Sequence, residues 1–214
     1  LRGTYLASDT NAVMHVPDYY ESGNLYIGVA TTNSATVVVP LSHSWTPKTD
    51  GTAYDILLTW DRAVFRLYID GVFVAHGLYS GDVAQTTNVG VSVGCDFGTS
   101  NTPRNFFNGK MRGVRMTCGH DRASGSTTTY LRHALPLTKT QSALSDALWG
   151  NVVFLLHGEG ADASTTFRDL SPYDRRMTAA GAVQNDTDIS VGDSPSVKFD
   201  ADGNYLVGAY GPEL

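Results

Sequence analysis

Alternation of apolar and polar residues predicts β-strands along most of this chain. Residues 54–60 (YDILLTW) place every second side chain on one face, namely Tyr54, Ile56, Leu58 and Trp60. Two further apolar runs follow at 64–69 and 72–77, separated by Asp70-Gly71. A type I′ turn needs positive φ at both central residues, which glycine adopts without strain and aspartate tolerates. The pattern therefore predicts three antiparallel strands in a meander.

Further short strands are predicted on both sides of a polar, aperiodic stretch that begins at Gly119. Those before it are 25–30, 36–41, 89–95 and 110–117, and those after it are 151–157, 196–200 and 204–210. The run NVVFLLH (151–157) is continuously apolar, which is typical of a strand buried on both faces. Residues 141–149 predict a short helix, with Thr140 as its N-cap. Short strands with turn signals at this density favour a sandwich or a barrel.

Composition and charge support a mainly β chain and exclude two classes of partner. Only three glutamates occur among 214 residues, together with 22 glycines, so few segments could form an amphipathic helix. The net charge is -6, and no basic stripe is present that could follow a phosphate backbone, so we expect no nucleic-acid partner. No segment approaches the run of about 20 apolar residues that spans a bilayer, so we expect no membrane span.

The two cysteines, Cys95 and Cys118, do not form a disulfide framework. They lie at the ends of two predicted strands and could pair if those ends meet. Two separate buried thiols are the favoured interpretation, because unpaired cysteine is commonly a small core residue. Their spacing is not that of a zinc site.

The first part of the chain resembles the laminin-G-like jelly rolls of the concanavalin A-like lectin/glucanase superfamily. The resemblance covers residues 25–117 and rests on a strand ending in Trp60, the hairpin Leu67-Tyr68-Ile69-Asp70-Gly71, Val93-Gly94, and Asn108-Gly109-Lys110. It implies an all-β, antiparallel jelly-roll β-sandwich. It does not imply one function, because this fold carries lectins, glycosidases and structural modules.

The last part resembles the opening of such a domain as it is found in bacteriophage virion proteins. The segments NVVFLLHGEG, FRDLSPYDRRMTAAGAV and SPSVKFDADGNYL carry this resemblance. It implies three parts: later strands of a jelly roll at 1–118, a linker with a short helix at 119–150, and opening strands at 151–214.

Two arrangements are compatible with this order. The chain is either cut from a tandem array, or residues 151–214 complete the sandwich begun at Leu1, as in a circular permutation. The central FTIEFWV-like strand that the family leads us to expect is absent, which counts against the second arrangement. An isolated half sandwich would expose unpaired edges, however, so we favour one contiguous sandwich.

Candidate catalytic and metal-binding motifs are weak in this sequence. The paired E-x-D-x-E carboxylates of concanavalin A-like glucanases cannot be formed by three scattered glutamates, so we expect no enzyme. His157, Glu159 and Asp162 could form a ligand cluster, but loop polar residues at a strand end are the favoured interpretation. Asp200-Ala201-Asp202-Gly203-Asn204 resembles a calcium loop, yet Gly203 is misplaced, so a tight turn is favoured. Arg175-Arg176 is interpreted as solvated surface.

A sugar-binding site would need exposed aromatic rings beside polar groups. Tyr19, Tyr20 and Trp45 are the candidates, although core packing or loop anchoring explains each at least as well. The sequence thus favours a non-enzymatic structural or adhesion module of a phage virion, without metal or cofactor. Its expected partners are other virion proteins, further copies of itself and host glycans. The alternative is a secreted, extracellular lectin-like carbohydrate-binding module.

Overall fold

The computed structural model describes residues 4–6, 15–16, 19–21, 23–30, 37–46, 48, 52–81, 91–97, 103–104, 106–119, 126–129, 148–191 and 194–209. Within these ranges every strand pairing is antiparallel, and the one helical element is a 3-10 turn, η1 (Trp149–Asn151). The predicted all-β, antiparallel fold class is therefore confirmed.

The strands fall into two groups along the chain. The first group is β1 (Thr4–Leu6), β2 (His15–Val16), β3 (Tyr19–Glu21), β4 (Asn24–Ala30), β5 (Val37–Ser44), β6 (Ile56–Trp60), β7 (Val64–Ile69), β8 (Val72–Leu78), β9 (Val91–Val93), β10 (Asp96–Phe97), β11 (Pro103–Arg104), β12 (Gly109–Met111) and β13 (Val114–Thr117). The second group is β14 (Val152–Leu156), β15 (Phe167–Arg168), β16 (Arg176–Ala180), β17 (Gln184–Val191), β18 (Ser194–Phe199) and β19 (Tyr205–Gly208).

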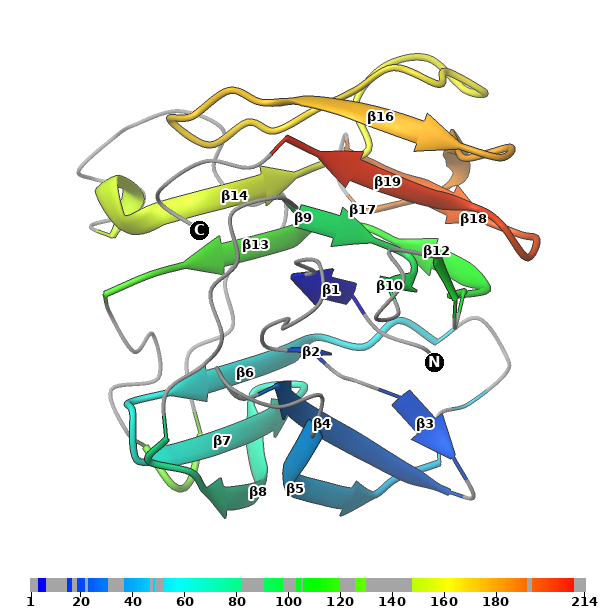
Figure 1. Ribbon diagram of the computed structural model, residues 1–214. Helices are drawn as coiled ribbons and strands as arrows, with labels where there is room; N and C mark the ends of the chain where they lie inside the picture. The colour runs from blue at the N-terminus through cyan, green and yellow to red at the C-terminus, as the bar shows by residue number, and fades with distance from the viewer. Residues whose placement is uncertain are drawn as a thin grey trace.

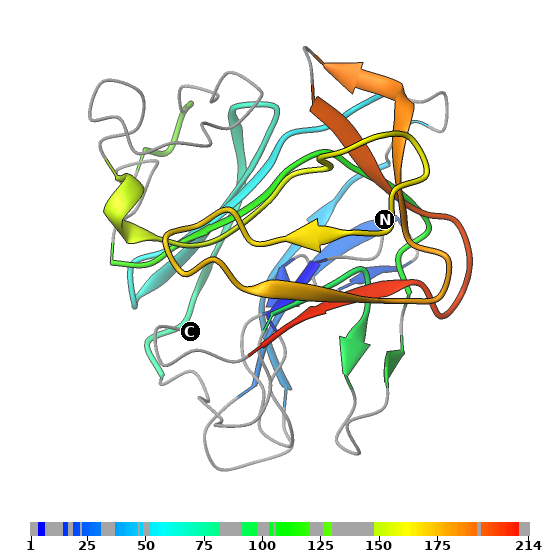
Figure 2. The same ribbon diagram turned by 90° about the horizontal axis from the view of Figure 1, so that it is seen from above.

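The largest sheet has six strands in the order β15-β16-β19-β9-β1-β2, and it runs from β16 at the top of the molecule down to β2 below its middle (Figure 1). Three-stranded sheets are formed by β12-β18-β17, β3-β4-β5 and β6-β7-β8, and two-stranded ones by β13-β14 and β10-β11. Seen from above, the strands form two facing layers, with β13 and β14 in one and β16 and β19 in the other (Figure 2). The architecture is a β-sandwich.

The predicted meander is confirmed as β6-β7-β8. Asp70 has φ 52° and Gly71 has φ 83°, and Ile69 pairs with Val72 across them. Positive φ at both central residues is the geometry of a type I′ turn. The meander packs its apolar face onto β4 and β5 around the buried residues Leu25, Leu41, Phe65 and Leu67, which we call the meander core.

The second core is built from both groups of strands, and we call it the shared core. Its buried members are Val93, Phe107, Phe154, Leu156, Phe167, Met177, Val183, Val197, Phe199 and Leu206. It is enclosed because strands of the second group pair with strands of the first: β19 with β9, β18 with β12, and β14 with β13. Residues 152–208 are therefore part of the same sandwich as residues 91–117. The three-part division at 118 and 150 stays a prediction.

Two predicted elements differ in detail from the structure. The single strand expected over 110–117 is divided into β12 and β13, because Met111 and Val114 pair with different partners, Val197 and Leu156. Of the helix expected over 141–149, residues 141–147 lie outside the described residues, and Trp149 belongs to η1. The run 151–157 is confirmed as a buried strand, since all five residues of β14 are buried.

The two cysteines are not joined by a disulfide. Cys95 is buried, whereas Cys118 is only partly buried, and burial raises the pKa of its thiol. The favoured interpretation of two separate thiols is confirmed, although only one of them is fully enclosed. Among the described residues there is no helix of the length and apolarity that crossing a membrane requires.

Candidate functional site

A cavity of about 380 Å³ lies where β14 ends and β15 begins. It is lined by His157, Glu159, Gly160, Ser164, Thr166, Phe167, Arg168 and Leu170. Two of the lining residues, Phe167 and Leu170, are apolar, and five others carry hydroxyl, carboxylate, imidazole or guanidinium groups. Small-molecule sites are commonly hollows lined by apolar side chains and a few polar groups.

The wall formed by residues 159–164 is fixed by hydrogen bonds to β17. Asn185 donates from its backbone nitrogen to the Ser164 carbonyl at 2.8 Å, and its own carbonyl accepts from the Ala163 nitrogen at 2.9 Å. The Asn185 side-chain amide also donates to the Glu159 carbonyl. These bonds hold the wall in one conformation and cover part of the edge of β17, which would otherwise expose unpaired backbone groups.

The glycines of the HGEG segment are required by this close packing. A Cβ atom at Gly158 would lie 2.6 Å from the Pro195 carbonyl oxygen. Gly160 has φ +113°, a backbone conformation that side chains strongly disfavour. The chain can therefore turn from β14 into the cavity wall only with glycine at these two positions.

A buried ion pair between Asp169 and Arg175 lies next to the cavity. The Asp169 carboxylate accepts from the backbone nitrogens of Leu155 and Ser171, both at 2.9 Å, and from the Arg175 guanidinium. Arg175 also donates to the Val153 carbonyl at 2.7 Å. The pair therefore joins the β15–β16 turn to the buried strand β14.

The interpretation of Arg175-Arg176 as solvated surface is wrong for Arg175. Arg175 is only 8% exposed, whereas Arg176 lies at the surface. Nothing in the dipeptide distinguishes the two arginines, because the difference comes from the reversal of the chain between Asp169 and Arg175. The D-x-S segment, Asp169 to Ser171, is the sequence feature that could have indicated a structured turn before Arg175, since such a carboxylate caps the turn that follows it.

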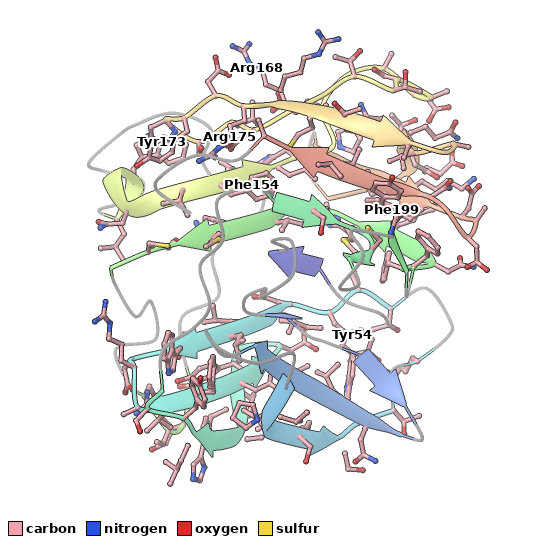
Figure 3. The ribbon with its side chains drawn as sticks, in the orientation of Figure 1. Tyr54, Phe154, Arg168, Tyr173, Arg175 and Phe199 are labelled. Carbon is pink, nitrogen blue, oxygen red and sulfur yellow. The ribbon has the colours of Figure 1, made fainter. Side chains whose placement is uncertain are left out.

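Arg168 forms the outer rim of the cavity and pairs with Asp174 at the surface. Figure 3 shows Arg168 at the outer edge of the sandwich, with Tyr173 and Arg175 on the adjoining turn. The side-chain hydrogen bond from Arg168 lowers the pKa of Asp174, and Asp174 in turn raises the pKa of Arg168. Both groups keep their charges at neutral pH, so the rim presents a guanidinium held in place by a carboxylate.

The three sequence candidates at this strand end are placed differently by the structure. His157 and Glu159 line the cavity, and His157 is only 3% exposed. Asp162 does not line it, because its carboxylate accepts from the Thr187 nitrogen at 3.1 Å. Among the residues that the structure describes, no three histidine, cysteine or acidic side chains are grouped to hold a metal ion.

The aromatic candidates for sugar binding belong to β3 and to the residue after β5, and these strands lie in the lower half of the molecule, away from β14 and β16 (Figure 1). Tyr19 and Tyr20 belong to β3 and pair with Tyr26 and Leu25, but their side chains lie outside the described residues. Trp45 is half-buried, packs against the meander core, and contacts Tyr54 edge-on with ring centroids 5.0 Å apart. It thus anchors the loop after β5, and a role of these three residues in sugar binding stays a prediction.

Acidic residues elsewhere take part in turns and ion pairs. Asp61 accepts from the Ala63 and Val64 nitrogens and from Arg66, and these bonds lower its pKa to about 2. Lys110 lies 2.7 Å from the Asp186 carboxylate. Asp200 pairs with Lys198 at 2.9 Å and accepts from the Asn204 amide, so the calcium-like segment 200–204 is a turn between β18 and β19.

The structure is an antiparallel β-sandwich with a strand that ends at Trp60 and a hairpin at Asp70-Gly71, the features on which the resemblance to concanavalin A-like domains rests. Comparison with known families agrees: a laminin G family model, described as the concanavalin A-like lectin/glucanases superfamily, matches residues 2–118. This is more than half of the 214 residues, and the chain belongs to this family. No curated protein and no solved structure matches the chain. The cavity lies outside the matched residues.

Proposed function

We propose that this protein is a non-enzymatic structural and adhesion module of a bacteriophage virion, located in the particle as a capsid decoration, tail or fibre component. It would hold neighbouring subunits together, and its surface would contact host glycans. The family membership supports the lectin-like scaffold. The phage context rests on the resemblance of segments within residues 151–206 to virion proteins.

The ion pairs formed by the acidic side chains are the observation that supports a non-enzymatic role. A retaining or inverting glycosidase needs two carboxyl groups about 5–9.5 Å apart across a sugar-sized groove. In the described residues, Asp61, Asp169, Asp174, Asp186 and Asp200 each pair with a basic side chain. The cavity is lined by one carboxylate, that of Glu159. Carboxylates fixed in this way stabilise the sandwich and are poorly placed to exchange protons with a substrate.

Sedimentation of a lysate from the source culture tests the virion role. We expect the chain to travel with DNA-containing particles, in a fixed number of copies per particle as measured by quantitative mass spectrometry. A chain that remains in the soluble fraction as a monomer would overturn this proposal.

A secreted lectin-like module is the second candidate, and the cavity is the observation that favours it. Its lining combines hydroxyl and guanidinium groups with two apolar side chains, which suits a polyhydroxylated ligand. Glycan-array binding separates the two sets of candidate residues. Loss of binding in Thr166→Val would assign the cavity, with Arg176→Ala as the control. Loss in Tyr20→Ala or Trp45→Ala, with Thr166→Val unaffected, would assign the aromatic residues. A chain that binds no glycan would rule out the lectin candidate.

A further inference from the structure

We propose that residues 148–209 form an exchangeable donor segment, which can complete the sandwich of a second copy of this chain. The receiving part, residues 1–118, is the acceptor segment. The proposal deepens the self-association expected of a virion module, and so it rests on the proposed function. The strand pairings and side-chain contacts between the two segments support it.

The donor and acceptor segments meet along three strand seams. Leu206 and Val207 pair with Val93 and Ser92, and β18 pairs with all three residues of β12. The third seam joins β14 to β13 through four residue pairs, from Val114 with Leu156 to Thr117 with Val152. Backbone hydrogen bonding thus continues from one segment to the other in three separate sheets.

The side chains across these seams fit together specifically at Phe199. Phe199 is fully buried, and its ring lies against Gly94, where a Cβ atom would be only 2.6 Å away. Phe107 closes the same socket with its ring edge-on at a centroid distance of 5.9 Å. Lys110 of the acceptor and Asp186 of the donor add an ion pair of 2.7 Å. The acceptor therefore has a shaped socket for one donor side chain.

The shared core cannot be closed by either segment alone. The acceptor contributes Val93 and Phe107 to its buried members, and the donor contributes Phe154, Leu156, Phe167, Met177, Val183, Val197, Phe199 and Leu206. An acceptor without a donor would expose the unpaired edges of β9, β12 and β13. Exposed edges and apolar faces of this kind pair readily with another chain.

The partner that fits this surface best is a second copy, because it supplies the same donor with the same contacts. Donor and acceptor are joined covalently through residues 119–147, and this connection starts and ends beside one seam, where the Cys118 nitrogen donates to the Asn151 carbonyl at 2.9 Å. Within it, Thr128 and Thr129 lie against β8 of the acceptor, where the Phe73 nitrogen donates to the Thr128 carbonyl at 2.9 Å. Exchanged and closed forms contain the same seams and differ in which chain supplies the donor. Linking two partners in one chain gives an effective concentration on the order of millimolar, so closure within one chain dominates in dilute solution. Exchange becomes competitive where many copies are crowded together, as in a particle.

Complementation between two defective full-length chains tests the proposal. Gly94→Val damages the acceptor, because the new side chain would overlap Phe199 at a residue with φ +92°. Phe199→Ala damages the donor by emptying the socket. Unfolded together and refolded as a mixture, the two chains should form a heterodimer, in which an intact donor fills an intact acceptor. One of its two units then joins an intact donor to an intact acceptor, and the other joins two damaged segments. We therefore expect a melting transition near that of the unaltered protein, which neither variant shows alone.

The matched control combines two donor defects, Phe199→Ala and Leu206→Ala. Every exchanged unit of this mixture still holds a damaged donor, so no rescue is expected. Rescue in the control equal to that of the test mixture, or no heterodimer in the test mixture, would overturn strand exchange.

The unaltered protein provides a second measurement that does not depend on the variants. Refolding at about 1 µM should give monomers, whereas refolding near 1 mM should give dimers that persist for hours after dilution. Size-exclusion chromatography with light scattering measures the molar mass and so distinguishes monomers from dimers. Monomers at every refolding concentration, or dimers that dissociate at once on dilution, would overturn the proposal. Exchange in a chain that is absent from sedimented particles would instead leave the exchange standing and remove the virion role.

Discussion

The meander core and the shared core are both buried and apolar, but they are assembled from residues at very different distances along the chain. In the meander core the principal contacts join neighbouring strands, β6 with β7 and β7 with β8. In the shared core the seams join β9, β12 and β13 to strands that follow residue 148. Closing long loops costs more conformational entropy before any contact is gained. One end of this sandwich therefore forms through contacts between strands that are close in sequence, whereas the other forms only when the chain returns after residue 148.

Breaking the buried ion pair should give the largest difference between the two regions. Arg175→Met leaves the Asp169 carboxylate buried without its guanidinium partner, at a residue with no exposed surface. Truncating one member of a buried pair typically costs about 3–5 kcal/mol. We expect a loss of that size in the free energy of unfolding measured in urea.

Arg176→Met is the matched control, because Arg176 is the exposed neighbour on the same turn. Surface substitutions of this kind usually change stability by less than about 0.5 kcal/mol. Equal losses for the two variants would mean that the Asp169–Arg175 pair does not hold β14 to the turn.

Truncation of one leucine in each core should show whether the two regions open separately. Leu67→Ala removes a buried side chain from the meander core, and Leu206→Ala removes one from the shared core. Each change should cost about 2–5 kcal/mol. Hydrogen exchange should then show faster opening of 91–117 and 152–208 in Leu206→Ala, with 56–78 still protected. Uniform loss of protection along the chain would show that the sandwich opens as one unit.

Substitution in the Asp70-Gly71 turn should have an intermediate effect, confined to the meander. Gly71→Val forces a β-branched residue to adopt φ 83°, which costs about 1–3 kcal/mol. We expect a lower melting temperature and a tendency to aggregate. Gly150→Val is the control, because nothing lies within 4 Å of a Cβ atom there. A melting temperature unchanged by Gly71→Val would contradict the type I′ turn.

The same contrast explains which features could be predicted from the sequence. Asp70-Gly71 and the alternation in 54–60 are local signals, and both the turn and the strands agree with the structure. The division of 110–117 into β12 and β13 could not be foreseen, since it is imposed by two distant partners, β18 and β14. At the candidate site, His157 and Glu159 stood out as polar residues at a strand end. Ser164, Thr166 and Arg168 did not, because the fold of the loop brings them to the cavity.

Acid should produce the smallest effect, at the turn that connects β6 to β7. The bonds from Arg66, Val64 and Ala63 lower the pKa of Asp61 from 3.8 to about 2. A carboxyl whose pKa is lowered in the folded state stabilises the protein above its unfolded pKa, and this stabilisation is lost as the pH falls from about 4 toward 2. Because Asp61 and its partner Arg66 lie partly in solvent, we expect only a small loss. In Asp61→Asn the free energy of unfolding should therefore fall slightly less between about pH 4 and pH 2 than in the unaltered protein. If the two proteins lose stability in parallel between these pH values, the Asp61–Arg66 contact contributes nothing to the meander, and the stability of this region comes from its apolar core and its turn alone.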